Sequence, residues 1–450
     1  MADKEGYGQA IGCWLRSHRE QIIRDLTDLV RIPSVAGTPD GEAPFGKDCL
    51  RVLGAVRELY RREGFSAALN DSGEYLLASV GEGEKTIGLF AHADVVPVED
   101  DWILTQPFEP MEKDGFLVGR GVLDDKSGVV GSLYVLKAFR ELGIPLKSRL
   151  LSFVGSNEEN GMADIRHYAG TETPPDFSFV PDTAFPLFIG NKGVLRVTVT
   201  SNAPFSSDLQ LRGGKPGFTV GKAEAYLNGQ LLTIANGVSK HSALPQGSVN
   251  AGVQVTQMLI RLPEIPDDDR TILQLYQTVA EDIYGEKIGI AHTDAKFGRL
   301  TCANMTVATE NGRLSFTLNI RYGIDADADG ILQNLTGFFE SRNWSVRIDG
   351  RLPAKLTDEQ DPCVTAALDV YRRFTGDSRA VPHLNAGGTY AMFLPRAVEI
   401  GPVMWNGANP FGLPEGHGRV HQPDEMIGID DLLKAMELTA LMILEVDKVL

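Results

Sequence analysis

Three polar clusters in this chain each follow a short apolar run or a glycine-rich turn, and this repetition constrains the fold more than any other feature. The clusters contain residues that can bind metal ions or transfer protons: His92, Asp94, Asp124, Asp125, Glu158 and Glu159. In an open α/β sheet, the ligand-binding crevice lies just beyond the carboxyl ends of the strands. Imidazole and carboxylate groups at such positions predict an α/β fold with a polar site at one edge of its sheet.

Segment 119–128, Gly-Arg-Gly-Val-Leu-Asp-Asp-Lys-Ser-Gly, carries the most concentrated negative charge of the three clusters. Its two aspartates lie in a glycine-rich turn just before the apolar run 129–136. Adjacent carboxylates raise each other's pKa unless a positive charge lies nearby. We therefore expect a two-metal hydrolase in which Asp124, the first of the pair, is shared between the metals.

The surrounding pattern predicts a mostly parallel sheet flanked by helices. Some segments repeat apolar residues at helical spacing, and others are short apolar runs bounded by turn residues, as strands are. The expected helices span 11–32, 47–63 and 127–142, and the expected strands span 75–80, 86–91, 149–154 and 176–180. Strands that alternate with helices of this length are typical of a parallel sheet covered on both faces.

A change of pattern after residue 190 indicates a second domain, as expected for 450 residues. Segments 193–200 and 313–322 alternate apolar and polar residues, which is typical of antiparallel strands. The strand and helix pattern of the first part resumes near residue 362. We therefore predict a metal-binding domain formed by residues 1–190 and 353–450, with an α+β domain, residues 191–352, inserted into it.

Charge and composition exclude several classes of function. The formal net charge is -17, and we find no stripe of lysines and arginines, so a nucleic-acid partner is not expected. The four cysteines are widely spaced without a CxxC pair, which favours reduced thiols over a zinc ribbon or a disulfide framework. No apolar run approaches the roughly 18 residues that would span a bilayer. We expect a soluble, cytoplasmic protein.

Two of the clusters are ambiguous when each is taken alone. The His92-Ala93-Asp94 motif occurs by chance in surface loops, and the Glu158-Glu159 pair is more typical of a solvated acidic turn. Placed after buried strands, His92 can bind a metal while Asp94 orients its ring. The glutamates can then divide the work, one binding metal and the other accepting a proton from the attacking water. Asp182, after the next strand, is either a further ligand or a residue that begins a turn.

Together, the motifs resemble the M20 metallopeptidase family over nearly the whole chain, and within it the PepV-type dipeptidases of bacteria. The matching segments are His-Ala-Asp-Val-Val-Pro at 92–97, Trp102, Pro107-Phe108, the 119–128 run, Ser-Asn-Glu-Glu at 156–159, Pro181-Asp182, Gly-Gly-Thr-Tyr at 387–390 and His-Gln-Pro-Asp-Glu at 421–425. Their order and spacing carry the resemblance, because each motif alone is short.

The resemblance implies two zinc ions, with cobalt or manganese as possible substitutes. One ion would be bound by His92, Asp124 and Asp182, and the other by Asp124, Glu159 and His421. Glu158 would be the general base, Asp94 would orient His92, and the peptide bond between Asp124 and Asp125 would be cis. His417 lies four residues before His421 in the same loop, and only the resemblance favours His421.

The resemblance also implies substrate contacts. His241 would stabilise the oxyanion, Arg321 would bind a substrate carboxylate through its two-pronged guanidinium, and Gly387 and Gly388 would offer backbone amides to the same carboxylate. Asn202 is a further candidate contact, although the loop after it does not align clearly.

We therefore expect a zinc-dependent dipeptidase that acts on small peptides with a free N-terminus. Its nearest alternative is an amidohydrolase of the same family that removes the acyl group of N-acyl amino acids. A non-catalytic binding protein that retains the fold is a third possibility, which the complete set of metal ligands disfavours. The resemblance also bears on the oligomeric state, because PepV-type enzymes have an enlarged insertion and are monomers, whereas dimeric relatives dimerise through the equivalent domain. The insertion here is of intermediate length, and we expect a monomer, with a homodimer as the alternative.

Overall fold

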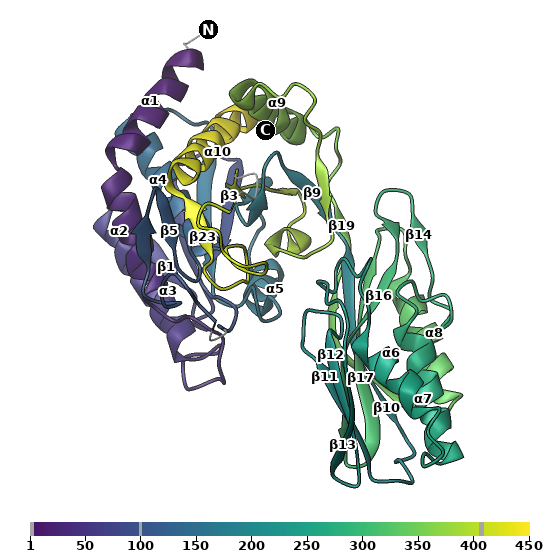
Figure 1. Ribbon diagram of the computed structural model, residues 1–450. Helices are drawn as coiled ribbons and strands as arrows, with labels where there is room; N and C mark the ends of the chain where they lie inside the picture. Colours follow the sequence, from purple (N-terminus) through teal and green to yellow (C-terminus); the bar gives the residue numbers. More distant parts are fainter. Residues whose placement is uncertain (1–3, 99–100, 405–408) are drawn as a thin grey trace. The chain divides into compact units, whose positions relative to one another are not determined.

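The computed structural model describes residues 4–98, 101–404 and 409–450. Segment 406–418, which its Gly, Asn and Pro content predicts to be a long loop, therefore lies partly outside the described residues. The chain forms two compact units (Figure 1). Unit 1 comprises Met1–Gly190, Thr357–His383 and Thr389–Leu450, and unit 2 comprises Asn191–Leu356 and Leu384–Gly388.

The short segment 384–388 belongs to unit 2, whereas the sequence pattern assigns it to the metal-binding domain. Hydrogen bonds account for the difference. The backbone N–H of Lys192 donates to the carbonyl of Asn385, and the side-chain amide of Asn191 donates to the carbonyl of Gly387. Such contacts between distant segments cannot be inferred from hydrophobic periodicity.

The main sheet of unit 1 is parallel at its centre and antiparallel at its edges. The strand order within unit 1 is β1-β2-β6-β3-β7-β21-β9, whereas β19 and most of β20 belong by their residues to unit 2. The neighbours β6, β3, β7 and β21 run parallel. The strands are β1 (Ala67–Leu69), β2 (Tyr75–Val80), β3 (Thr86–His92), β6 (Arg149–Gly155), β7 (Phe177–Val180), β9 (Phe188–Asn191), β19 (Lys355–Leu356), β20 (His383–Asn385) and β21 (Ala397–Glu399). The predicted α/β class is confirmed.

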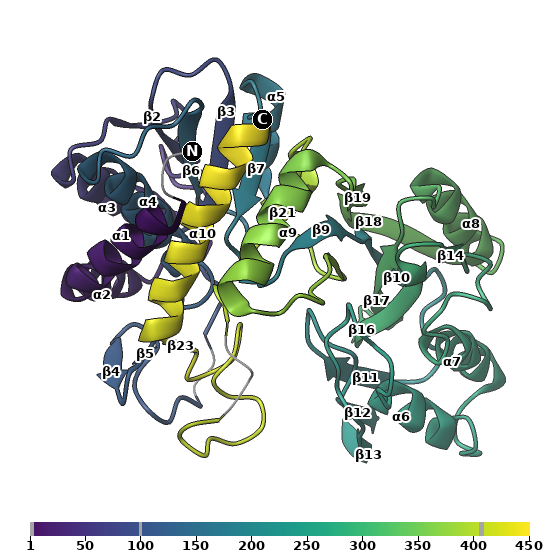
Figure 2. The same cartoon turned by 90° about the horizontal axis from the view of Figure 1, so that it is seen from above.

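Helices cover this sheet, and one of them is almost wholly buried. Helix α4 (Lys126–Glu141) packs on β3 and β6, and α1, α2 and α10 pack on α4 (Figure 2). The remaining bounds are α1 (Lys4–Ser17), α2 (Arg19–Val30), α3 (Lys47–Arg62), α5 (Ala163–Thr171), α9 (Pro362–Thr375), η1 (Tyr390–Phe393) and α10 (Ile429–Val449). Smaller strands of the unit are β4 (Met111–Lys113), β5 (Phe116–Val118), β8 (Thr183–Ala184), β22 (Pro402–Val403) and β23 (Met426–Gly428). No helix in the described ranges is long and apolar enough to cross a membrane.

Unit 2 is a seven-stranded antiparallel sheet in the order β13-β12-β11-β16-β17-β10-β18. Its strands are β10 (Gly193–Ser201), β11 (Leu209–Gly214), β12 (Lys222–Leu227), β13 (Gln230–Asn236), β16 (Thr301–Glu310), β17 (Arg313–Tyr322) and β18 (Trp344–Leu352). A two-stranded ribbon, β14 (Thr293–Asp294) with β15 (Gly298–Arg299), and the helices α6 (Ala251–Leu259), α7 (Asp267–Ala280) and α8 (Ala328–Glu340) complete the unit.

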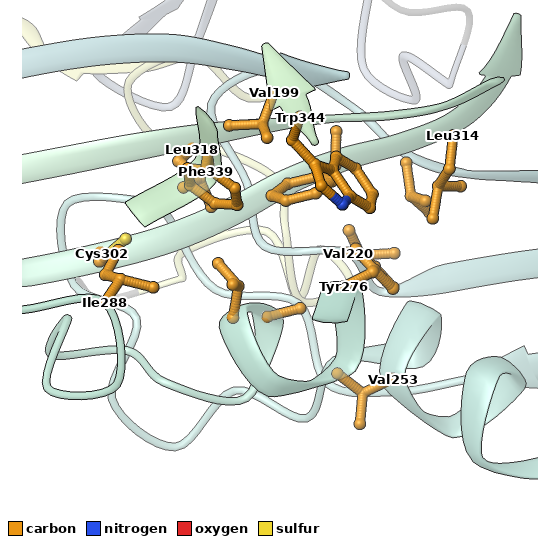
Figure 3. Close-up of a cluster of buried hydrophobic side chains, with 14 of the residues drawn as sticks. Val199, Val220, Val253, Tyr276, Ile288, Cys302, Leu314, Leu318, Phe339 and Trp344 are labelled. Atoms are coloured by element: carbon orange, nitrogen blue, oxygen red, sulfur yellow. The ribbon is translucent and has the colours of Figure 1, made fainter. Parts of the chain in front are cut away.

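The alternation along β17 separates two chemically different faces of this sheet. Leu314, Phe316, Leu318 and Ile320 belong to the apolar core that also includes residues of the three helices, part of which Figure 3 shows. Because successive side chains of a strand point to opposite faces, the odd-numbered residues of β17 project from the other face. That face therefore carries Arg321.

Candidate metal centre

The three central parallel strands of unit 1 bring the polar clusters to one edge of the sheet. His92, the last residue of β3, is paired in register with Gly155, the last residue of β6. Because these strands run parallel, the residues after their ends emerge at the same edge. Glu158 and Glu159 follow β6 by a few residues, and Asp182 follows β7 in the same way.

Asp124 lies at the centre of this group, with a histidine on each of its carboxylate oxygens. His92 Nε2 is 3.0 Å from Asp124 Oδ1 and 3.6 Å from Asp182 Oδ1. His421 Nε2 is 2.9 Å from Asp124 Oδ2 and 3.0 Å from Glu159 Oε1. The peptide bond between Asp124 and Asp125 is cis, as expected. All five predicted ligand residues therefore gather around one carboxylate.

Asp94 supports the centre in two ways. Its Oδ1 and its backbone carbonyl lie 3.4 and 3.0 Å from His92 Nδ1, which leaves Nε2 of that ring directed at Asp124. The same carboxylate accepts the backbone N–H groups of Glu158 and Glu159, each at 3.1 Å. Asp94 is fully buried, so it fixes both the imidazole and the turn that carries the glutamates.

The charges of the centre favour a cation. Burial, reinforced by Asp124, raises the pKa of Asp182 to about 7, and burial raises the pKa of Glu158 well above its ordinary value. Burial lowers the pKa of His421, but Glu159 and Asp124 outweigh it and raise that pKa to about 12. Concentrated carboxylates in a buried site are stabilised by metal ions. Imidazole nitrogens and carboxylate oxygens that lie about 3 Å apart are suited to binding the same metal ion.

Glu158 is distinct from the other carboxylates of the centre. Its side chain is buried, and its Oε1 has no hydrogen-bond partner among the described residues. Glu159, in contrast, contacts His421. A buried oxygen without a partner is costly unless a water molecule or a ligand satisfies it. Glu158 Oε1 is therefore open to a water molecule or a ligand.

The contacts of the two loop histidines distinguish them. His417 Nδ1 lies 2.7 Å from Asp424 Oδ2, and the carboxylate of Asp424 also accepts the backbone N–H groups of Ile103 and Leu104. His417 thus ties two loops together, whereas His421 reaches Asp124. A spacing of four residues in a loop could not have decided between them.

We expect His421→Ala to weaken metal binding by at least about tenfold, because even the partners of metal ligands contribute that much. His417→Ala is the matched control, and it should leave the affinity unchanged, since its ring contacts Asp424. Titration calorimetry of the metal-free protein with zinc measures both. Equal losses in the two variants would contradict the assignment of His421.

Two buried groups that the sequence analysis did not single out hold the Asp124 turn. Glu425 Oε1 accepts the backbone N–H groups of Gly121, Leu123 and Asp124 at 2.9 to 3.1 Å. Its other oxygen lies 2.6 Å from Arg120 Nη1, and both side chains are buried. The sequence signal for Glu425 was its position at the end of the motif that begins with His421. No sequence pattern links Glu425 to Arg120.

Asp125 also lies near the centre, within 4.8 Å of ligand atoms of His92 and Asp182. Its Oδ1 accepts the backbone N–H of Gly128, which caps helix α4, and its Oδ2 accepts the backbone N–H of His92. Both oxygens are thus used in local structure, which explains an aspartate at this position without a role as ligand.

In unit 2, Arg321 is a buried cation without a carboxylate partner among the described residues. Its Nε donates to Asn319 Oδ1 at 2.9 Å, and its Nη1 donates to the carbonyl of Ala386 at 3.2 Å. Burial, with a smaller effect of Arg196, lowers the pKa of Arg321 to about 10, so it stays charged at neutral pH. An uncompensated buried guanidinium favours an anionic ligand.

Two other predicted contacts lie near this arginine. The carbonyl that Arg321 binds belongs to Ala386, which directly precedes Gly387 and Gly388. Asn319 Nδ2 donates to the hydroxyl of Ser242 at 3.2 Å, which places His241 close by. Asn319 itself was not anticipated, and it joins Arg321 to the His241 segment.

Asn202 lies away from Arg321 within unit 2, and its role as a substrate contact stays a prediction. Its backbone N–H and side chain bond to Asn343, beyond the far end of β10. Arg321 is paired with Val194, near the start of the same strand. Eight residues of strand span roughly 26 Å.

Comparison with known proteins shows the family and the fold to which this chain is similar. Residues 88–445 match the family described as "Peptidase family M20/M25/M40". A Bacillus subtilis (strain 168) protein with the name "Putative dipeptidase YtjP" is 28% identical over 469 residues, covering 96% of this chain and 98% of that protein. Human carnosine dipeptidase 1 has the same fold, with a TM-score of 0.64 at 18% identity, covering 98% of this chain and 99% of that one.

Proposed function

Because the chain belongs to the M20/M25/M40 peptidase family, we propose that it is a dinuclear zinc dipeptidase that hydrolyses the peptide bond of dipeptides with a free N-terminus. The observation that carries the proposal is the position of Asp124, whose two oxygens each contact a different histidine. Each of these histidines also lies near a second carboxylate, His92 near Asp182 and His421 near Glu159. The name of the Bacillus subtilis relative supports the substrate class.

The proposed zinc sites share Asp124. His92 and Asp182 would complete one site, and Glu159 and His421 the other. Nitrogen and carboxylate ligands without a thiolate suit zinc, with cobalt or manganese as substitutes. Two such ions, when bound, lower the pKa of water and polarise the scissile carbonyl.

Glu158 is the general base of this proposal. Its buried Oε1, which has no partner among the described residues, would take the proton of the attacking water and return it to the leaving amine. Asp94 holds the backbone of Glu158, so the carboxylate is positioned before the substrate arrives. His241 would donate to the developing oxyanion, a contribution of about 2.7 to 4 kcal/mol where it has been measured for other donors.

Arg321 would bind the free carboxylate of the substrate, with Gly387 and Gly388 contributing backbone amides. Its burial without a carboxylate partner among the described residues supports this role. A substrate that is held at both ends, by its carboxylate at Arg321 and by its free amine near the metals, would be limited in length. This favours a dipeptidase over a general peptidase.

We expect the zinc-loaded protein to release amino acids from Ala-Ala much faster than from N-acetylalanine or Ala-Ala-Ala, and to lose this activity with 1,10-phenanthroline. Amino acid release quantified by chromatography provides the readout, and restoration of activity by added zinc is the control. Faster turnover of N-acetylalanine would instead support an amidohydrolase of the same family. Equal rates for the tripeptide would argue against a substrate that is held at both its carboxylate and its amine.

A further inference from the structure

Unit 2 contains a cavity of about 490 Å³ beside Arg321, a volume within the usual range of ligand sites. Two strand contacts place it there. Thr301, which lines the cavity, is paired in register with Arg321 across β16 and β17, so both side chains project from the same face. Ala386, also in the lining, accepts the hydrogen bond of the Arg321 guanidinium.

The charged residues that line this cavity are all cations: Lys192, Lys296 and Arg299. Not every one of these cations lacks an anionic partner within the unit. Arg299 stacks on Tyr284 and forms an ion pair with Glu286 at 2.5 Å. Its charge is therefore largely compensated within the unit.

Lys192 is different. Its Nζ donates to the carbonyl of Arg299 at 2.7 Å, and it has no carboxylate within ion-pair distance in the described part of the chain. Burial lowers the pKa of Lys192, and the nearby Arg321 acts in the same direction against the opposing effect of Asp294. The oxygens of Asp294 are occupied by backbone N–H groups, among them that of Lys296. Lys192 thus has a half-buried ammonium group whose remaining N–H groups can donate hydrogen bonds to a ligand.

Thr301 supplies an independent observation. Its side chain is 1% exposed, and its hydroxyl has no hydrogen-bond partner among the described residues. A buried hydroxyl without a partner costs free energy. Beside a lysine without a counter-ion, the hydroxyl becomes a donor to an anionic group in the cavity.

We propose that this cavity binds the acidic side chain of the substrate's C-terminal residue, with Lys192 as the cation and the Thr301 hydroxyl as a donor. The inference rests on the proposed dipeptidase function, because Arg321 would hold the α-carboxylate while Lys192 holds the second one. The preferred substrates are dipeptides that end in glutamate or aspartate.

The test compares kcat/KM for Ala-Glu and Ala-Gln, which differ in charge and hardly in shape. We expect the wild type to prefer Ala-Glu by about tenfold or more, as for a charge-assisted contact. Lys192→Met should reduce the ratio to about one, and Lys192→Arg should retain most of it. Lys222→Met is the matched control, because Lys222 pairs with Glu224 and lies outside the cavity lining. Since each ratio is measured within one variant, partial loss of folded protein does not affect it.

Dipeptide turnover without an acidic preference, or a preference that survives Lys192→Met, would overturn this inference and leave the proposed function intact. If no dipeptide is cleaved, the proposed function fails. In that case, calorimetry measures the affinity of the cavity for free L-glutamate and for free L-glutamine. Tighter binding of glutamate that is lost in Lys192→Met supports the acidic site, and equal binding overturns it.

Discussion

Replacing Glu158 with glutamine is expected to reduce kcat for dipeptides by roughly 10²–10⁴-fold, the usual contribution of a general base. This corresponds to about 3 to 5 kcal/mol in the activation barrier. The amide keeps the shape of the side chain but cannot accept the proton of the attacking water. Metal content, measured by inductively coupled plasma mass spectrometry, should not change, because Glu158 contacts neither histidine of the centre in the described structure.

Two comparisons distinguish loss of a base from loss of structure. Glu159→Gln should reduce both turnover and metal content, because Glu159 Oε1 contacts His421. The melting temperature of Glu158→Gln in chelator should equal or exceed that of the wild type, since a buried carboxylate oxygen without a partner becomes a neutral amide. A Glu158→Gln protein that keeps more than a tenth of wild-type kcat would refute the role of this residue.

Arg120→Met is expected to lower the free energy of unfolding of unit 1 by about 3 to 5 kcal/mol, because it leaves the buried carboxylate of Glu425 without its cation. The arginine also stacks near Trp102, with 5.6 Å between its guanidinium carbon and the ring centre. Since Glu425 holds the backbone of the Asp124 turn, the variant should bind zinc more weakly as well. Thermal unfolding in chelator should show a melting temperature lower by on the order of 10 °C.

The matched control is Arg347→Met in unit 2. Arg347 forms an ion pair with Asp349 at 2.7 Å, but its side chain is 76% exposed. Exposed ion pairs contribute little, about 0 to 1 kcal/mol. A melting temperature shift in Arg120→Met no larger than in Arg347→Met would show that the buried pair does not stabilise the turn.

The fold of unit 1 and the convergence of the centre follow from local sequence signals. Short apolar runs that end at the same edge of a parallel sheet explain why His92 and Glu158 come together, as expected from their positions after strands. The α/β class and the membership of the family are confirmed. The PepV-type subgroup and the monomeric state stay predictions.

Contacts between distant segments were beyond the sequence pattern. Arg120 and Glu425 are 305 residues apart, and neither residue has a spacing that marks its partner. His417 and His421 offered the same chemistry in the same loop, and only the contact of His417 with Asp424 separates them. The position of Asn202 relative to Arg321 was not predictable for a related reason, because the register of the sheet, and not a motif, determines which residues lie near Arg321.

The central claim is that Asp124 binds two cations at once. Anomalous diffraction at the zinc edge, from crystals of the zinc-loaded protein, measures this directly. The account predicts two anomalous peaks about 3.5 to 4 Å apart, with one oxygen of Asp124 within about 2.0 to 2.2 Å of each. A single peak, or two peaks of which only one lies beside Asp124, would contradict it.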